Sequence, residues 1–199
     1  MVGMILLSAR FPTPIDRVPV VKYVDPPGPR LRYPAERRPT LTLAGGEARK
    51  ISSVLNVSEK MRFGDFVWND EGVAAGPAWA RIDLARQVIS VFRGDDEIGT
   101  AVILYGTDGM PTPTGHFAVR KMDPAYYSRS YDAPMPFAMF LTDDGVAIHA
   151  SNVRSGFATH GCIGVPEGFA RRLFAEIKRG DSVWVLPPAA APAQANRAT

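Results

Sequence analysis

Short apolar segments alternate with turn sequences over most of the stretch between residues 79 and 186. Residues 79–84 alternate apolar and polar side chains, which is the pattern of a strand with one buried face. Residues 87–92 follow after a short break and predict a hairpin with the first segment. Turns rich in Gly, Pro and Asp separate further predicted strands at 98–105, 117–120, 136–141, 146–150 and 182–186.

One segment has the periodicity of a helix. Pro166 suits a first helical turn, and the apolar residues that follow fall on one helical face: Phe169, Ala170, Leu173, Phe174 and Ile177. Lys178 and Arg179 suit the negative end of the helix, and Gly180 is a typical stop. The expected fold class is therefore mainly β, a sandwich or barrel-like arrangement of mixed sheets with one packed α-helix.

Composition divides the chain into four parts. Residues 1–40 form a Pro-rich basic arm, with eight of the 18 prolines, and we expect a solvated tether rather than a segment that touches an acidic polymer. Residues 41–77 are expected to be a loop-rich lead-in that packs on the body at 78–187. Residues 188–199, rich in Ala and Pro, are expected to be a disordered tail.

Charge and hydropathy exclude several classes of protein. The net charge of +3 is too small to indicate a nucleic-acid partner, and no stretch approaches the roughly 18 apolar residues of a membrane span. The apolar start at residues 1–7 is short and no basic residue precedes it, so an export signal is not evident.

Cys162 is the single cysteine of the chain, which excludes an intrachain disulfide and a multi-cysteine zinc ribbon. It lies just before the expected helix, where backbone N–H groups lower a thiol pKa and hold an oxyanion. His149, at the end of an apolar strand thirteen residues upstream, can reach the sulfur and activate it as a base. Its second ring nitrogen needs an acceptor, which the carbonyl of Ala150 or a neighbour can supply.

Two other interpretations of these residues stay open at this stage. Cys162 can be a buried structural residue beside two core histidines. Alternatively, His149, His160 and Cys162, with His116 as a further ligand, can form a catalytic zinc site, although the spacing is weak and no Glu stands beside either histidine as a base.

The stretch from Trp79 to Leu186 resembles the L,D-transpeptidase catalytic domain, also called the YkuD domain. The motifs that carry the resemblance occur in the order of that family: the opening hairpin at 82–92, Thr112-Pro-Thr-Gly115 before Phe117, Met135-Pro-Phe137, Ile148-His-Ala150 and Thr159-His-Gly-Cys-Ile163. The resemblance implies the mixed sheets and packed helix of the L,D-transpeptidase type.

The resemblance also implies site roles. Cys162 would be the nucleophile and His149 the general base, oriented by the carbonyl of Ala150, with the backbone of His160, Gly161 and Cys162 as oxyanion hole. His160 would in addition brace the loop. The candidate substrate-binding residues are Thr159, Arg154, Met135 and Phe137. No metal or organic cofactor is implied.

Two departures from the family pattern concern the same loop. Gly164 stands where the family often has Arg or Asn, which removes a side chain that could brace the site, and Arg154 or Arg120 are the candidate substitutes. The loop from His149 to His160 is shorter than is common in the family, which implies a smaller wall over the nucleophile.

The resemblance implies a peptidoglycan L,D-transpeptidase that forms 3→3 cross-links between stem peptides through a cysteine thioester and is a target of carbapenems. The alternatives are an L,D-carboxypeptidase, a transferase that tethers a protein to the wall, and an inactive peptidoglycan-binding domain. Since cross-linking occurs outside the cytoplasmic membrane, the periplasm or cell envelope is the expected location. The acceptor, the oligomeric state and any partner of residues 1–77 are not fixed by the sequence.

Overall fold

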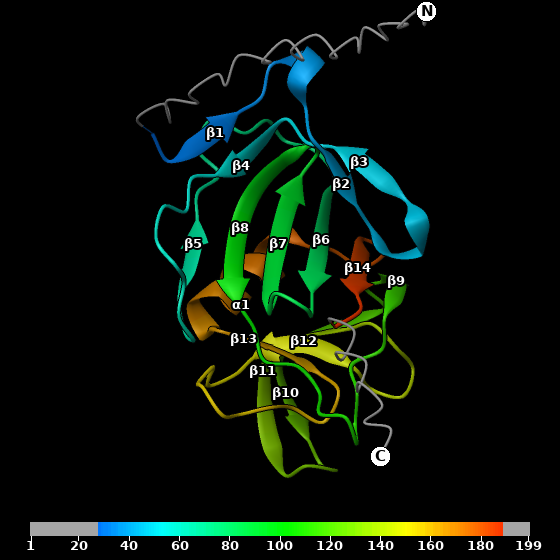
Figure 1. The fold of residues 1–199 in the computed structure, drawn as a ribbon. Helices are drawn as coiled ribbons and strands as arrows, with labels where there is room; N and C mark the ends of the chain where they lie inside the picture. The colour runs from blue at the N-terminus through cyan, green and yellow to red at the C-terminus, as the bar shows by residue number, and fades with distance from the viewer. Residues whose placement is uncertain (1–27, 189–199) are drawn as a thin grey trace, which may run out of the picture.

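The computed structural model describes residues 28–188, which form two packed β-sheets of eight and four strands, a separate two-stranded sheet and one α-helix (Figure 1). The predictions for residues 1–27 of the arm and for 189–199 of the tail lie outside this range. The larger sheet has the order β1-β4-β8-β7-β6-β14-β9, and β5 also pairs with β8. Its strands are β1 (Arg30–Arg32), β4 (Ser53–Leu55), β5 (Phe66–Trp68), β6 (Ala78–Asp83), β7 (Val88–Arg93), β8 (Asp96–Val102), β9 (Gly115–Ala118) and β14 (Ser182–Leu186).

The four-stranded sheet, the smaller of the two packed sheets, carries His149, and Cys162 lies in the turn directly before its last strand. It has the order β10-β11-β12-β13, with strands β10 (Lys121–Ser128), β11 (Ala133–Phe140), β12 (Ala147–Ala150) and β13 (Ile163–Val165). The pairs β10–β11 and β11–β12 are antiparallel, whereas β12 and β13 are parallel. The expected hairpin of β11 and β12 is confirmed, and so is the mainly β class with mixed sheets and one α-helix.

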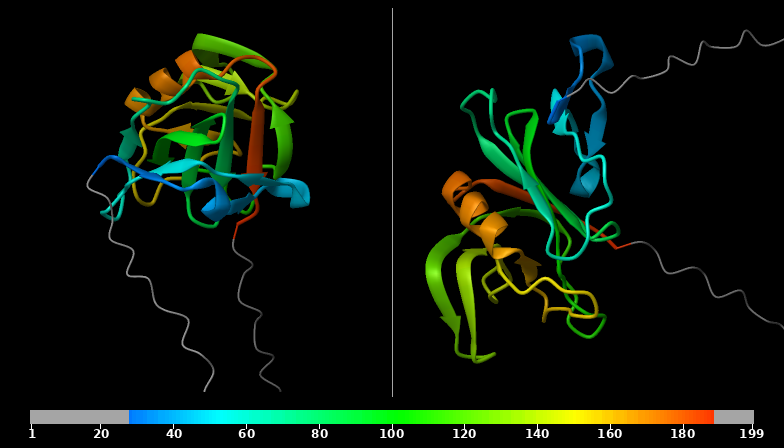
Figure 2. Two further views of the ribbon diagram at one scale, coloured as in Figure 1. Left: turned by 90° about the horizontal axis from the view of Figure 1, so that it is seen from above. Right: turned by 90° about the vertical axis from the view of Figure 1, so that its left-hand side faces the viewer.

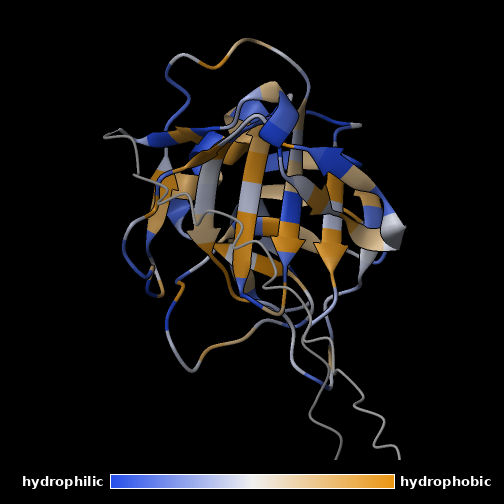
Figure 3. Cartoon of the chain, turned by 45° about the horizontal axis from the view of Figure 1, so that its top comes forward, coloured by the Kyte–Doolittle hydropathy of each residue, from blue (hydrophilic) through white to orange (hydrophobic). Residues whose placement is uncertain are grey.

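The main hydrophobic core lies between the two sheets, where helix α1 (Glu167–Glu176) packs (Figure 2). Phe169, Ala170 and Leu173 of α1 are fully buried there together with apolar residues of both sheets. Hydrophobic residues accordingly fill much of the central strands (Figure 3). The helical periodicity in the sequence therefore marks the face that joins the sheets.

The lead-in is more regular than the sequence indicates. It contains the hairpin of β2 (Thr40–Thr42) and β3 (Ala48–Lys50), the 3₁₀ helices η1 (Ala35–Arg37) and η2 (Ala44–Gly46), and strands that extend the larger sheet. Its buried side chains Leu43 and Ile51 join a second cluster with Trp79, Phe92 and Trp184 on the outer face of that sheet. The lead-in thus covers apolar surface that the main body would otherwise expose to water.

β5 connects the lead-in to helix α1. The ring of Phe66 makes an edge-on contact with Phe169 at 5.9 Å between centroids, and Trp68 does the same at 5.5 Å. A side chain at Gly168 would meet the Phe66 ring at 3.0 Å. This part of the lead-in therefore fits closely against the start of α1.

The expectation of a solvated tether is wrong for β1. Arg30 is only 8% exposed, and its guanidinium donates to Ser53 Oγ at 2.9 Å and to the backbone oxygens of Glu97 and Asn69, both at 2.5 Å. A guanidinium carries five donors, so it can be buried where acceptors surround it. β1 pairs only with β4 at the edge of the sheet, a position where neighbouring prolines are tolerated.

The end of the helix and one additional strand also differ from expectation. Helix α1 ends at Glu176 rather than at Gly180, because Ile177 is extended and buried, and Asp181 accepts a hydrogen bond from the Lys178 N–H at 2.8 Å. Strand β10 was not anticipated, since its sequence mixes polar and apolar residues without regular alternation and half of its side chains are exposed.

No helix of residues 28–188 combines the length and the apolar character that crossing a bilayer requires.

We expect Ile51→Ala to lower the free energy of unfolding by about 2–5 kcal/mol, because it opens a cavity beside Trp79 and Trp184. Urea denaturation followed by tryptophan fluorescence should show a single transition at lower urea. The control Val57→Ala changes a residue that is 37% exposed and should shift stability by less than about 0.5 kcal/mol. Equal stability of both variants would contradict the role given to the lead-in.

Candidate active site

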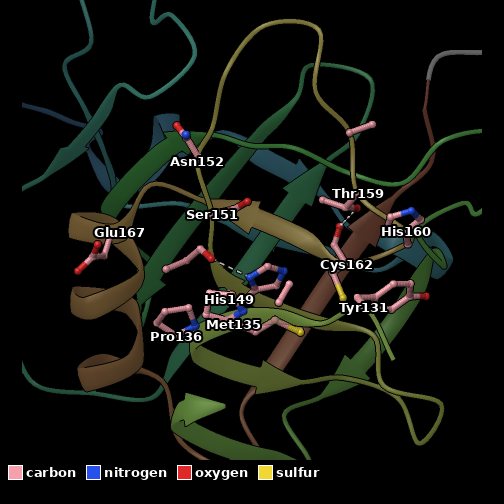
Figure 4. A pocket seen from close by; sticks show the side chains of 14 residues that line it. Tyr131, Met135, Pro136, His149, Ser151, Asn152, Thr159, His160, Cys162 and Glu167 are labelled. Carbon is pink, nitrogen blue, oxygen red and sulfur yellow. Dashed lines mark hydrogen bonds between the residues drawn. The ribbon is translucent and has the colours of Figure 1, made fainter. Parts of the chain in front are cut away.

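The parallel pairing of β12 and β13 places His149 and Cys162 on one face of the smaller sheet. Its register sets His149 opposite Gly164 and Ile148 opposite Ile163. Because side chains alternate along a strand, Cys162, two residues before Gly164, opens to the same side as His149. Both side chains line one groove (Figure 4).

The loop that carries Cys162 is held by hydrogen bonds at both of its ends. Thr159 N–H donates to the Tyr105 carbonyl at 3.0 Å, and Thr159 Oγ1 donates to the Cys162 carbonyl at 2.5 Å. Leu104 and Gly164 exchange two backbone hydrogen bonds of 2.8 and 3.0 Å. The turn 159–162 is therefore fixed to the segment that leaves β8.

Close backbone packing adds to this rigidity. Gly161 has a φ of +106°, a conformation that other residues rarely adopt, and a side chain at Gly106 would lie 2.9 Å from its Cα. The Gly106 N–H donates to Thr112 Oγ1 at 2.9 Å, and Thr112 is buried. The Thr-Pro-Thr-Gly segment therefore supports the turn 159–162 in addition to forming a turn of its own.

The groove has a volume of about 600 Å³ and runs along β11 and β12. In Figure 4, Cys162, Thr159, His160 and Tyr131 lie at one end, His149 is central, and Asn152 and Glu167 lie at the other end. The rings of Tyr131 and His160 are stacked, with centroids 4.8 Å apart and planes 12° apart. This stack connects the tip of the β10–β11 hairpin to the turn 159–162.

His149 is poised as a neutral base. Its Nδ1 lies 2.8 Å from the Ala150 carbonyl oxygen, which can only accept, so the neutral ring carries its proton on Nδ1 and leaves Nε2 free to take one. Burial lowers the pKa of His149, and the hydrogen bond to Ala150 raises it in part. The imidazole is therefore uncharged at neutral pH.

Cys162 is a protonated thiol at rest. Burial raises the pKa of Cys162, a backbone hydrogen bond with Ala147 lowers it, and the negative charge of Asp144 raises it. The Sγ lies 3.8 Å from the Gly145 carbonyl, an acceptor that suits the thiol form. His149 and Cys162 line the same groove, and the directions of their two pKa shifts both favour uncharged side chains rather than an ion pair.

The structure brings some of the candidate substrate-binding residues into the groove and leaves others outside. Thr159 and Met135 line it, as do His160 and Ala150. Arg154 is exposed and does not line the groove. Phe137 packs away from it, against Phe174 at 5.8 Å and beneath the guanidinium of Arg171 at 5.5 Å.

The two alternative interpretations of Cys162 are not supported. Cys162 is partly exposed and lines the groove, so it is not sealed in apolar packing. His116 is stacked on Trp184 at 4.5 Å and contacts Ser182, on strands of the other sheet. Within residues 28–188 no group of three or more His, Cys, Asp or Glu side chains is placed to hold a metal ion.

Sequence reasoning missed four polar residues of the groove: Tyr131, Ser151, Asn152 and Glu167. Tyr131 lies in a turn with no motif of its own. Ser151 and Asn152 directly follow the strand that carries His149, so their position after a site strand was the one signal that could have found them. Glu167 was interpreted only as a favourable first residue of the helix.

The comparisons with known proteins show to which family the chain belongs. The family model of the L,D-transpeptidase catalytic domain, YkuD, matches residues 77–185, more than half of the chain. The chain therefore belongs to this family. No curated protein matches it.

Solved structures show the same fold at low sequence identity. An L,D-transpeptidase from Stackebrandtia nassauensis has a TM-score of 0.53 and 19% identity, over 58% of either chain. An L,D-transpeptidase from Enterococcus faecium has a TM-score of 0.51 and 22% identity, over 56% of this chain and 50% of that one. An L,D-transpeptidase in complex with imipenem has a TM-score of 0.52 and 20% identity, over 55% of this chain and 58% of that one. The match thus spans between half and three fifths of the length of these structures.

Gly164 fits the packing of this site. A Cβ at this position would lie 2.8 Å from Ser151 Cβ and 3.4 Å from Leu104 Cβ, so Ser151 fills the space that a side chain would need. The two expected substitutes do not replace that side chain in the groove, since Arg154 does not line it and Arg120 forms an ion pair with Asp143 at 2.7 Å.

Alkylation of Cys162 by iodoacetamide should test the resting state. Since the pKa of the thiol is raised, we expect the rate to rise about tenfold per pH unit from roughly pH 7 to pH 9, without a plateau. The single cysteine makes intact mass a direct readout. A plateau below pH 7 would reveal a thiolate–imidazolium pair and contradict the neutral resting state.

We expect Gly164→Asn to lower the free energy of unfolding by about 1–3 kcal/mol, because the new Cβ overlaps Ser151. The measurement is a double-mutant cycle with Ser151→Gly, analysed by urea denaturation. The double variant should recover much of the loss that Gly164→Asn causes in the parent background. Strictly additive effects would show that Ser151 is not the obstacle.

Proposed function

We propose that the protein is a peptidoglycan L,D-transpeptidase that forms 3→3 cross-links through a thioester on Cys162. The observation that carries the proposal is the arrangement of Cys162 and His149 in one groove, with His149 Nδ1 held on the Ala150 carbonyl. Membership of the L,D-transpeptidase catalytic domain family supplies the substrate class.

In the first step His149 Nε2 takes the proton of the Cys162 thiol, and the sulfur attacks the carbonyl carbon of the third residue of a tetrapeptide stem. A C–S bond forms, and the carbonyl oxygen becomes an oxyanion. When the C–N bond to the terminal D-alanine breaks, the leaving amine takes the proton from His149. The products of this step are D-alanine and the thioester.

The backbone N–H groups of the turn 160–162 are the proposed oxyanion donors. The fixed position of this turn supports the assignment, because Thr159 binds the Cys162 carbonyl and Gly161 packs on the Gly106–Thr112 segment. Donors that are already in place stabilise a developing charge without reorganising during the reaction.

In the second step an amine of a neighbouring stem attacks the thioester. His149 takes the proton of the attacking amine, the new C–N bond forms, and the C–S bond breaks. The sulfur then regains its proton from His149. With water as acceptor the same steps would give an L,D-carboxypeptidase, and with a protein amine they would tether a protein to the wall.

The substrate sets the proposed location. Peptidoglycan stems are cross-linked outside the cytoplasmic membrane, so the proposal places the protein in the periplasm or cell envelope. A solved relative is described in complex with imipenem, and we extend this to the chain as a proposed carbapenem adduct on Cys162.

Purified protein incubated with tetrapeptide muropeptides should release D-alanine and form cross-linked dimers, and a carbapenem should add its mass to the intact chain. Cys162→Ala should abolish dimers and adduct, and His149→Gln should slow acylation by about 10²–10⁴-fold. The matched control His116→Gln changes a histidine of the other sheet and should retain activity. Dimer formation by Cys162→Ala would overturn the mechanism.

A further inference from the structure

The groove continues past His149 to a second end, which Ser151, Asn152 and Glu167 line (Figure 4). In the β12–β13 register each residue of β12 stands opposite the one fifteen positions later, and Ser151 N–H donates to the Val165 carbonyl at 2.8 Å. Glu167, the first residue of α1, follows β13 by two positions and lines the same end of the groove as Asn152 (Figure 4). Asn152 is three positions after His149, which corresponds to roughly 10 Å along an extended chain.

The position that the attacking nitrogen must take indicates that this end of the groove binds the acceptor. His149 must give a proton to the leaving amine and later take one from the attacking amine, so both nitrogens lie between the Cys162 thioester and His149. Whatever is attached to the attacking nitrogen then extends beyond His149. In Figure 4 that direction leads to Ser151, Asn152 and Glu167.

Glu167 is the one acidic side chain among the groove-lining residues, and no Lys or Arg side chain of the described chain lines the groove. Its carboxylate binds Arg171 Nη2 at 3.1 Å, but the side chains of this pair are 66% and 68% exposed. Such exposed pairs are weak and exchange readily with solvent and other ions. The acceptor end therefore presents an available negative charge.

We propose that Ser151, Asn152 and Glu167 form the acceptor subsite, and that Glu167 favours a primary amine over water. The inference rests on the function proposed above. A primary amine of the lysine type is an ammonium ion at neutral pH, which Glu167 attracts into the groove. Once there, the ammonium loses one proton to water and attacks the thioester as described. Water gains nothing from the carboxylate, so the charge shifts the outcome from hydrolysis toward cross-linking.

The experiment measures how the acyl-enzyme divides between its two fates. A diaminopimelate-containing tetrapeptide stem serves as donor and amine acceptor, and mass spectrometry gives the ratio of dimer to hydrolysed tripeptide. This ratio is taken within each variant, so changes in the acylation rate cancel. In Glu167→Gln at low salt we expect the ratio to fall about three- to tenfold, the order of magnitude of a partly screened charge interaction at such a distance.

Three comparisons make the test specific. Arg171→Gln removes the competing cation and should raise the ratio, whereas Glu71→Gln makes the same charge change at an exposed site outside the groove and should leave it unchanged. About 0.5 M salt should shrink the effect of Glu167→Gln. Hydroxylamine, which is uncharged at pH 8, should compete with water with less dependence on Glu167 than the stem amine shows.

An unchanged ratio of dimer to tripeptide in Glu167→Gln, with acyl-enzyme present, would overturn the acceptor subsite and leave the proposed function intact. Absence of an acyl-enzyme in every variant, the parent protein included, would overturn the proposed function itself.

Discussion

The parallel pairing of β12 with β13 is the constraint on which the site depends. It brings the strand that carries His149 beside the turn that carries Cys162, although the two residues are separated by a loop. The two strands and the segments that follow them line the groove from Cys162 past His149 to Asn152 and Glu167 (Figure 4). A parallel pair needs a crossover connection, and here this connection forms one wall of the groove.

Electrostatics give this arrangement a defined resting state. Burial favours the uncharged form of both side chains, because it lowers the pKa of His149 and raises the pKa of Cys162. A neutral pair avoids the free-energy cost of placing two charges in a half-buried groove. The Ala150 carbonyl keeps the ring in the tautomer that leaves Nε2 free to accept a proton, as the proposed mechanism requires.

The central strands of the larger sheet and the β11–β12 hairpin could be predicted from the sequence, because their apolar segments and turns have strong periodicity. The prediction that His149 and Cys162 face one another rested on a strand end and a returning loop. Other features depend on tertiary contacts that leave no local pattern. β10 has no regular apolar alternation and is stabilised by pairing with β11, and Arg30 is buried because acceptors from three distant segments surround it. The stack of Tyr131 on His160 likewise joins residues with no shared motif.

The close fit of β5 against the start of α1 has a consequence for divergence within the family. Phe66 lies outside the stretch that matches the family model, yet it packs on Phe169, two residues after Glu167 in the groove. Gly64 similarly approaches the backbone of Val153, next to Asn152. Substitutions in this accessory segment can thus adjust the groove wall while Cys162 and His149 stay untouched, which offers evolution a route to change the shape of the groove within the family.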